Sequence, residues 1–161
     1  MRKFRKTFIA LAAAVMLVVG SNSALASNQH IQWETEPNDT FATASQAISY
    51  NISQAINRGF ISSTTDIDYW KFEYGTNPNG YQIALQVPSG GYNYGVSVFE
   101  KVNGQYQLFS NDPGDFYEDV YVTIPGPRSD GTIREFIIAI YSPYNIIFTP
   151  DKYYQLVIDP L

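Results

Sequence analysis

Short alternating apolar runs, each closed by turn-forming residues, most constrain how this chain can fold. The clearest run covers residues 81–87, where Tyr81, Ile83, Leu85 and Val87 alternate with Gln82, Ala84 and Gln86. A period of two places neighbouring side chains on opposite faces, which is typical of a half-buried β-strand. No long stretch after residue 26 has the 3.6-residue period of a helix. The pattern therefore predicts an all-β fold.

Eight such runs are expected to form strands, with clusters of Gly, Pro, Asn and Asp between them. They are residues 56–62, 69–74, 81–87, 93–101, 105–110, 117–124, 133–141 and 153–158. Their spacing of roughly 8–12 residues predicts an antiparallel β-sandwich or jelly roll. The dipeptide Asn103-Gly104 favours a tight hairpin between two of the strands. The only helical prediction is one or two turns in residues 40–47, capped by Asp39 or Thr40.

The first 26 residues have the pattern of a secretory signal peptide. A basic start is followed by an apolar run at residues 7–20, and Ala24-Leu25-Ala26 supplies the small residues of a cleavage site. We expect cleavage after Ala26 and a secreted, extracellular protein. The alternative is a single N-terminal membrane anchor. The predicted organisation is a signal peptide at 1–26, an acidic linker at 27–39 and a β-sandwich at 40–161.

Charge and cysteine content narrow the classes of partner and of fold. Four of the ten basic residues and none of the fifteen acidic ones precede residue 27, so the remainder carries six minus fifteen, or −9. Such a chain has no electrostatic reason to bind nucleic acid or, after signal cleavage, anionic membrane. The sequence contains no cysteine, which excludes a disulfide scaffold. A bound metal would then be a useful additional constraint on the fold.

Two short clusters of oxygen-bearing side chains are candidates for such a metal site. The candidate residues are Glu34, Glu36, Asn38 and Asp39 in the first cluster and Asp66 and Asp68 in the second. Hard oxygen donors without imidazole or thiolate suit Ca²⁺ rather than zinc or copper. The alternative is a set of solvated acids together with a helix cap at Asp39.

The same two clusters lie in motifs that resemble a known family. Glu34-Thr-Glu36-Pro-Asn38-Asp39-Thr40, Gly59-Phe60-Ile61 and Asp66-Ile-Asp68-Tyr69-Trp70-Lys71-Phe72 resemble the bacterial pre-peptidase C-terminal domain. The segments 135–141 and 153–158 are similar to the closing strands of that family. The resemblance covers essentially residues 33–159. The family that the motifs resemble is related to the collagen-binding domains of bacterial collagenases.

The resemblance implies a non-catalytic β-sandwich that accompanies secreted peptidases. It also implies calcium ligands at Glu34, Glu36, Asn38, Asp66 and Asp68, with Asp39 and backbone carbonyls near Ser63 as lesser candidates. Some members bind collagen through an aromatic strand face. No peptidase-like segment precedes the motifs in this sequence, so we expect a module made on its own.

The sequence is rich in aromatic residues, with thirteen Tyr, ten Phe and two Trp. Tyrosine combines a flat apolar ring with a polar tip, which suits binding of sugars and extended polypeptides. Tyr92, Tyr94 and Tyr144 flank Gly or Pro in expected loops, so we predict that they are exposed and bind the ligand. The alternative for each is packing in the core or along a strand edge.

Catalytic motifs are not evident, and we expect no enzymatic activity. The chain has no cysteine, and its single histidine, His30, lies near the expected cleavage site. The acidic run at residues 112–119 is interpreted as a solvated loop, with a second cation site or a weak glycosidase pair as alternatives.

Together these features predict a secreted, calcium-binding β-sandwich module that binds an extracellular protein or polysaccharide. The alternative function is an accessory, chaperone or inhibitor that acts in trans on a co-secreted peptidase.

Overall fold

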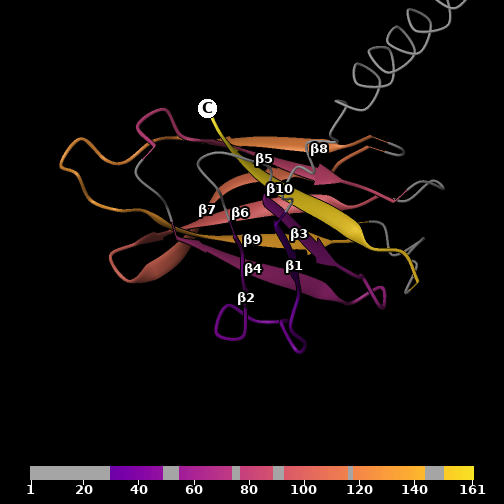
Figure 1. The fold of residues 1–161 in the computed structure, drawn as a ribbon. Coiled ribbons are helices and arrows are strands. Elements are labelled where there is room, and N and C mark those ends of the chain that lie inside the picture. The colour runs from indigo at the N-terminus through magenta and orange to yellow at the C-terminus, as the bar shows by residue number, and fades with distance from the viewer. Residues whose placement is uncertain (1–29, 49–54, 74–76, 89–92, 116–117, 144–150) are drawn as a thin grey trace, which may run out of the picture.

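The computed structural model describes residues 30–48, 55–73, 77–88, 93–115, 118–143 and 151–161. These residues form ten strands in two five-stranded sheets that stack face to face (Figure 1). They include no helix, and so no helix that could cross a membrane. The predicted all-β sandwich is confirmed. The expected signal peptide lies outside the described residues.

The first sheet has the order β1-β3-β10-β5-β8. Its strands are β1 (His30–Trp33), β3 (Ala55–Gly59), β10 (Tyr154–Pro160), β5 (Tyr81–Gln86) and β8 (Val120–Ile124). The second sheet has the order β2-β4-β9-β6-β7. Its strands are β2 (Ser45–Gln46), β4 (Ile67–Glu73), β9 (Glu135–Tyr141), β6 (Gly95–Val102) and β7 (Gln105–Asp112).

The eight expected strands correspond to β3 to β10, and the structure adds β1 and β2 at the N-terminal side. Both added strands pair in parallel with a longer strand, β1 with β3 and β2 with β4, whereas the other pairs are antiparallel. Each sheet is therefore mixed: the antiparallel pairing expected for the longer strands is present, and one parallel strand is added at an edge of each sheet. The segment expected as a linker contains β1.

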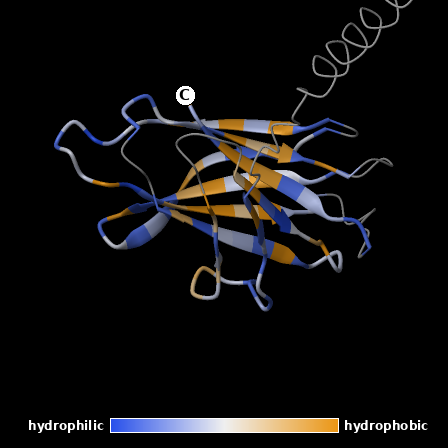
Figure 2. Ribbon diagram, viewed as in Figure 1, coloured by the Kyte–Doolittle hydropathy of each residue, from blue (hydrophilic) through white to orange (hydrophobic). Residues whose placement is uncertain are grey.

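The core lies between the two sheets, where the apolar positions of the alternating strands meet. Figure 2 shows the alternation of hydrophobic and hydrophilic positions along the strands. The largest side chains without exposed surface include Trp70, Phe72, Tyr81, Phe136 and Tyr154. Burial of such aromatic side chains supplies the main stabilising free energy of a domain without disulfides.

The predicted helical segment at residues 40–47 is instead a turn followed by a strand. Thr43 N–H donates to the Thr40 carbonyl at 3.1 Å, and β2 begins two residues later. Phe41 then packs against the rings of Tyr69, Phe99 and Tyr106 at centroid distances of 5.0, 5.1 and 5.1 Å. Aromatic packing onto the second sheet therefore prevails over the weak helical preference of this short segment.

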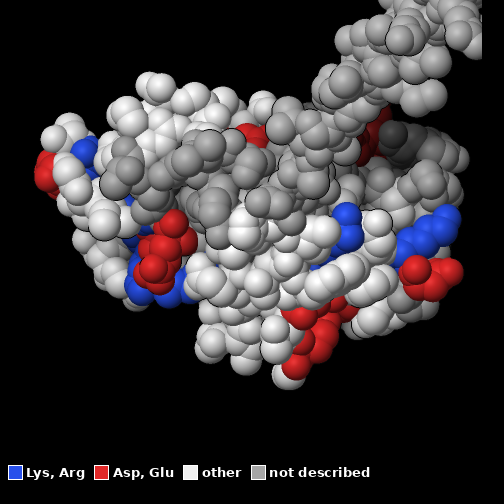
Figure 3. All heavy atoms as spheres, in the orientation of Figure 1, with Lys and Arg blue, Asp and Glu red and all other residues white. Residues whose placement is uncertain are grey.

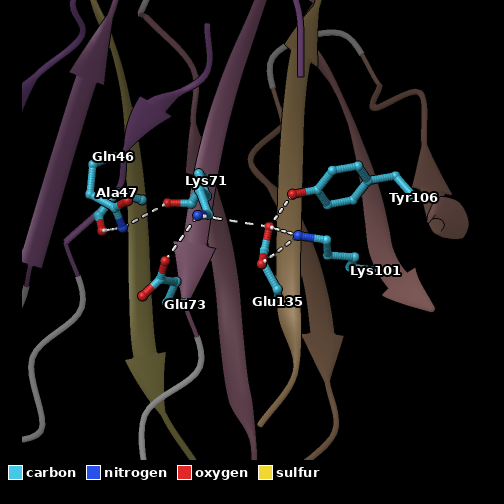
Figure 4. A network of polar contacts seen from close by, with 7 residues as sticks. All are labelled: Gln46, Ala47, Lys71, Glu73, Lys101, Tyr106 and Glu135. Carbon is cyan, nitrogen blue, oxygen red and sulfur yellow. Dashed lines mark hydrogen bonds and ion pairs between the residues drawn. The ribbon is translucent and has the colours of Figure 1, made fainter. Parts of the chain in front are cut away.

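A polar network joins neighbouring strands of the second sheet (Figure 4). Lys101 Nζ lies 3.0 Å from Glu135 Oε2, and Lys71 Nζ lies 2.9 Å from Glu73 Oε1 and 3.8 Å from Glu135 Oε1. The Tyr106 hydroxyl donates to Glu135, and partial burial with this neighbouring carboxylate raises the pKa of Tyr106 to about 12. The positive charges of the two lysines are thus compensated by carboxylates within the network.

Asn57 is a fully buried polar residue that ties three segments together. Its side chain accepts from Ile48 N–H at 2.8 Å and donates to the carbonyls of Ile48 at 3.1 Å and Leu156 at 3.2 Å. A buried amide is tolerated only when such bonds are made. Asn57 therefore fixes the chain after β2 against β3 and β10.

Replacement of Asn57 by Ala is expected to lower the free energy of unfolding by about 2–4 kcal/mol. The change leaves an N–H and two carbonyl groups of the backbone without this partner, and each loss costs about 1–3 kcal/mol before relaxation. Chemical denaturation measures the effect, with Gln82→Ala at an exposed position of β5 as the control. Equal stability of the two variants would contradict this role.

Candidate metal centre

The two acidic clusters meet because each lies beside a strand end at the same place in the fold. Beyond β1, Glu34 N–H donates to the Arg58 carbonyl at 2.9 Å, so the chain continues along β3. Farther on, the Asn38 carbonyl accepts from Tyr69 N–H at 3.2 Å, which holds the first cluster against β4. The second cluster lies at the start of β4, with Asp68 on its inner face.

Three carboxylates converge at this point. Glu34, Glu36 and Asp68 each offer an oxygen, and these oxygens all lie within 4.8 Å of one another. Asp68 has no exposed surface, Glu34 is half-buried and Glu36 is exposed. Glu36 is followed by a cis peptide bond to Pro37. A hollow of about 540 Å³ opens beside them, lined also by Asp39, Asp66 and the segment around Ser63.

Asn38 is the fourth member of the centre and is completely buried. One of its amide atoms lies 3.2 Å from Asp68 Oδ1 and 3.1 Å from Glu36 Oε2. Without a cation this atom must be the nitrogen, which donates to both carboxylates. With a cation between the oxygens, the amide oxygen would occupy this position. Asn38 therefore fits both the metal-free and the metal-bound arrangement.

The innermost carboxylates are held in place by neutral donors. Tyr154 donates its hydroxyl hydrogen to Asp68 Oδ2 at 2.6 Å, and Trp70 Nε1 donates to the Tyr154 hydroxyl oxygen at 2.8 Å. Glu34 Oε1 accepts from the backbone N–H of Phe60 at 2.7 Å. These bonds orient the two carboxylates without neutralising them.

Like charges and burial together make the cluster bind protons strongly in the absence of a cation. Burial, with the adjacent Glu34 carboxylate, raises the pKa of Asp68 to about 10. Burial also raises the pKa of Glu34, of Glu36 and of Asp39, and neighbouring carboxylates add to each shift. The ion pairs of the described residues include none of these four acids. The centre therefore favours either protons or an external cation.

The donor set suits a hard divalent cation. Calcium takes six to eight oxygens from carboxylates, amide and backbone carbonyls and water in a flexible geometry. The centre offers three carboxylates, one amide and an open side that water can reach. It contains no imidazole or thiolate, which softer transition metals prefer. The residues therefore fit Ca²⁺ better than zinc or copper.

All six residues expected from the sequence lie in or beside this centre. Asp66 lines the hollow, and its Oδ2 accepts from Ser62 N–H at 2.5 Å. Asp39 also lines the hollow and is exposed. No helix begins at Asp39, so the alternative of a helix cap there is wrong.

Of the three tyrosines predicted to bind the ligand, only Tyr94 is among the residues that the structure describes. Tyr94 has no exposed surface and packs edge-on against Tyr154, with 6.2 Å between the ring centroids, so its predicted exposure is wrong. Its position immediately before β6 turns its ring into the core. Tyr92 and Tyr144 lie outside the described residues.

The acidic run at 112–119 does not form a comparable centre among the residues described. Asp112 Oδ1 accepts from Gly114 N–H at 2.9 Å, and Asp119 Oδ1 accepts from Val87 N–H at 3.1 Å. The first bond closes a turn, and the second links the end of β5 to the residue before β8, so each carboxylate accepts a local backbone bond in agreement with the interpretation of this run as a solvated loop.

The sequence motifs did not predict that two further residues, Tyr154 and Gly59, contribute to the centre. Tyr154 was expected only as part of a strand, yet its hydroxyl group bonds Asp68. Gly59 allows the close approach of Glu34 and Tyr154, because an added Cβ would clash with both side chains. The sequence gives one indication of the role of Tyr154. Consecutive residues of a strand lie on opposite faces of the sheet, so one of Tyr153 and Tyr154 must face inward.

Comparison with known proteins gives no further assignment. No family model matches this chain, and no curated protein matches it either. The candidate metal centre therefore depends on the geometry described above and on the two sequence motifs.

Gly59→Ala is expected to lower the free energy of unfolding by about 1–3 kcal/mol, which is typical of overpacking a tight site. The new methyl group would displace the Glu34 carboxylate and the Tyr154 hydroxyl group. Thermal unfolding measures the effect, with Gln107→Ala on exposed β7 as the control. A variant as stable as the control would show that the close approach is not required.

The metal-free protein is expected to lose stability as pH rises from 5 to 8. When folding raises the pKa of a carboxyl group, the resulting stabilisation is fully present below the pKa that the group has in the unfolded state, which is about 3.9 for Asp. For Asp68 this contribution is lost as pH rises toward the folded value of about 10. We expect a loss of at least about 1 kcal/mol over this interval. Denaturation in EDTA at several pH values measures it.

The matched variant is Asp68→Asn, which keeps the size of the side chain and an acceptor for Tyr154. Its stability should vary less with pH over the same interval than that of the unmodified protein. Identical pH profiles for the two proteins would contradict the assignment of the pH dependence to Asp68.

Proposed function

We propose that this protein is a secreted, non-catalytic β-sandwich module that binds calcium and an extracellular polymer. The observation that carries the proposal is the convergence of Glu34, Glu36 and Asp68 around Asn38, with no basic side chain paired to them among the described residues. An uncompensated buried carboxylate is costly unless it is protonated or coordinates a cation. A calcium ion removes that cost.

The ion would act mainly as a structural clamp. Its ligands come from the chain after β1 and from the start of β4, which belong to different sheets. Coordination would therefore join the two layers at one end of the sandwich. Binding to the folded state alone adds stability in proportion to the logarithm of the metal concentration. This role suits a chain without cysteine.

Location outside the cell is supported by the sequence pattern of residues 1–26 and by the chemistry of the centre. Extracellular calcium modules bind with dissociation constants of about 10⁻⁴–10⁻³ M. An open centre with one exposed ligand, Glu36, is compatible with this range. The binding role is supported by exposed aromatic residues beside the centre, among them Trp33 and Tyr153.

Calorimetric titration of the purified protein with calcium tests the metal centre directly. We expect one site with a dissociation constant of about 1 mM or lower. Asp68→Asn should weaken binding at least about tenfold, because it removes a carboxylate charge from the site. Asp159→Asn on β10 is the matched control, since Asp159 lies outside the cluster.

Unchanged calcium binding in Asp68→Asn, or no binding by the unmodified protein, would contradict the proposed centre. Retention of the protein on insoluble protein or polysaccharide tests the polymer-binding role separately. Failure to bind any such material would remove that part of the proposal.

A further inference from the structure

A row of side chains crosses the outer face of the first sheet next to the metal centre. Trp33 of β1 is in register with Arg58 of β3, Arg58 with Gln155 of β10, and Gln155 with Gln86 of β5. Alternation along these strands directs the row away from the core, since Tyr154, Leu85 and Gly59 beside it are buried. The row thus forms one continuous strip across four strands.

Exposed aromatic rings form one end of this strip. Trp33 stacks on Phe60 with 5.7 Å between centroids and 10° between planes, and Tyr153 meets Trp33 edge-on at 5.5 Å. Trp33 is 44% exposed and Tyr153 is 40% exposed, although both are large apolar side chains. Neighbouring contacts fix the rings while part of their surface remains in solvent. Fixed, exposed aromatic rings are a common basis of recognition.

Arg58 places a fixed positive charge beside these rings. Its Nε and Nη2 donate to Gln155 Oε1 at 3.2 and 2.9 Å, and its guanidinium lies 4.5 Å from the Tyr153 ring centroid. In contrast, Arg128 and Arg134 are paired with a carboxylate. No ion pair between described residues includes Arg58. Its charge is therefore held in place by neutral groups and is not compensated by a described acid.

A shallow hollow of about 350 Å³ adjoins Tyr153 and is lined also by Gln86, Gln155, Asp151 and Lys152. Gln155 Nε2 donates to Gln86 Oε1 at 2.9 Å, and within the part of the chain that the structure describes the amide nitrogen of Gln86 makes no hydrogen bond. In Figure 3, basic atoms lie over β3 and β10 and over the segment before β10, where acidic atoms lie against them. The strip therefore combines flat rings, a cation and an amide donor.

We propose that this strip binds an acidic sugar, a carboxylate-bearing pyranose of an extracellular polysaccharide. The inference rests on the proposed polymer-binding role and specifies its ligand. The apolar face of the sugar ring would lie on one of the two rings, Trp33, and its rim would meet Tyr153, because these rings stand at 86° to each other. Its carboxylate would accept from the Arg58 guanidinium, for which a planar cation is well suited. A ring hydroxyl would accept from the Gln86 amide.

The backbone arrangement favours a sugar over an extended polypeptide. Arg58, Gln155 and Gln86 lie on β3, β10 and β5, each of which pairs with a strand on both sides. A polypeptide added to a sheet gains most from unpaired backbone groups at an edge strand, and this part of the strip offers none. A sugar instead bonds side chains with its hydroxyl groups, which the amides and guanidinium of the strip can satisfy.

Calorimetric titration with two trisaccharides tests the proposal. One is a trimer of galacturonic acid and the other is the neutral trimer of galactose, which has the same ring stereochemistry. In EDTA, so that metal bridging is excluded, the acidic trimer should bind at least about tenfold tighter. Arg58→Gln should abolish this preference while the neutral trimer binds as before. Trp33→Ala should weaken binding of both trimers at least about tenfold.

Arg128→Gln is the matched control, because it removes an arginine that pairs with Glu100 at another place in the fold. It should keep the preference for the acidic trimer. Circular dichroism establishes that each variant is folded. If Arg58→Gln retains the preference, or if neither trimer binds the unmodified protein, the proposed sugar site is overturned.

Two further outcomes distinguish a failure of the sugar site from a failure of the proposed function. Calcium binding without binding of either trimer would leave the metal centre in place and overturn the sugar site. Arg58-dependent binding of a hexapeptide with a free C-terminal carboxylate, without sugar binding, would assign the strip to polypeptides and also overturn it.

Discussion

The carboxylate of Asp68, buried with Glu34 and without a basic partner among the described residues, is the constraint on which one end of the sandwich depends. It lies at the start of β4, it is bonded by Tyr154 of β10, and Tyr154 in turn accepts from Trp70. The bonds cross from one sheet to the other, so the polar centre continues into the aromatic core. Such a network is stabilising only when its charge is compensated, by protons or by a metal ion.

Alternation along two strands connects this centre to the outer surface. On β10 and just before it, Tyr154 turns inward to Asp68 while Tyr153 turns outward. At the end of β1, Trp33 is exposed while Glu34 joins the centre. The same short segments therefore supply the candidate metal ligands and the aromatic strip. A metal ion that orders these segments would also order the surface beside them, which joins the two proposed binding properties through local structure.

Much of this arrangement could be predicted from the sequence. The alternating runs identified β3 to β10, and the two acidic motifs identified all six residues in or beside the centre. The parallel strands β1 and β2 were missed because they are short and gain stability from pairing with longer strands rather than from their own pattern. The burial of Tyr94 and the bond from Tyr154 to Asp68 depend on contacts between residues far apart in sequence, which local patterns do not encode.

The most direct test of the central claim is thermal unfolding of the protein in EDTA, in millimolar calcium and in millimolar magnesium. Saturation at a hundred times the dissociation constant adds about 2.7 kcal/mol, which raises the midpoint by several degrees in a domain of this size. A rise specific to calcium is predicted, because the centre offers many flexible oxygen ligands and not a rigid octahedron. The same midpoint in all three solutions would contradict the account and leave the buried carboxylates to be compensated by protons alone.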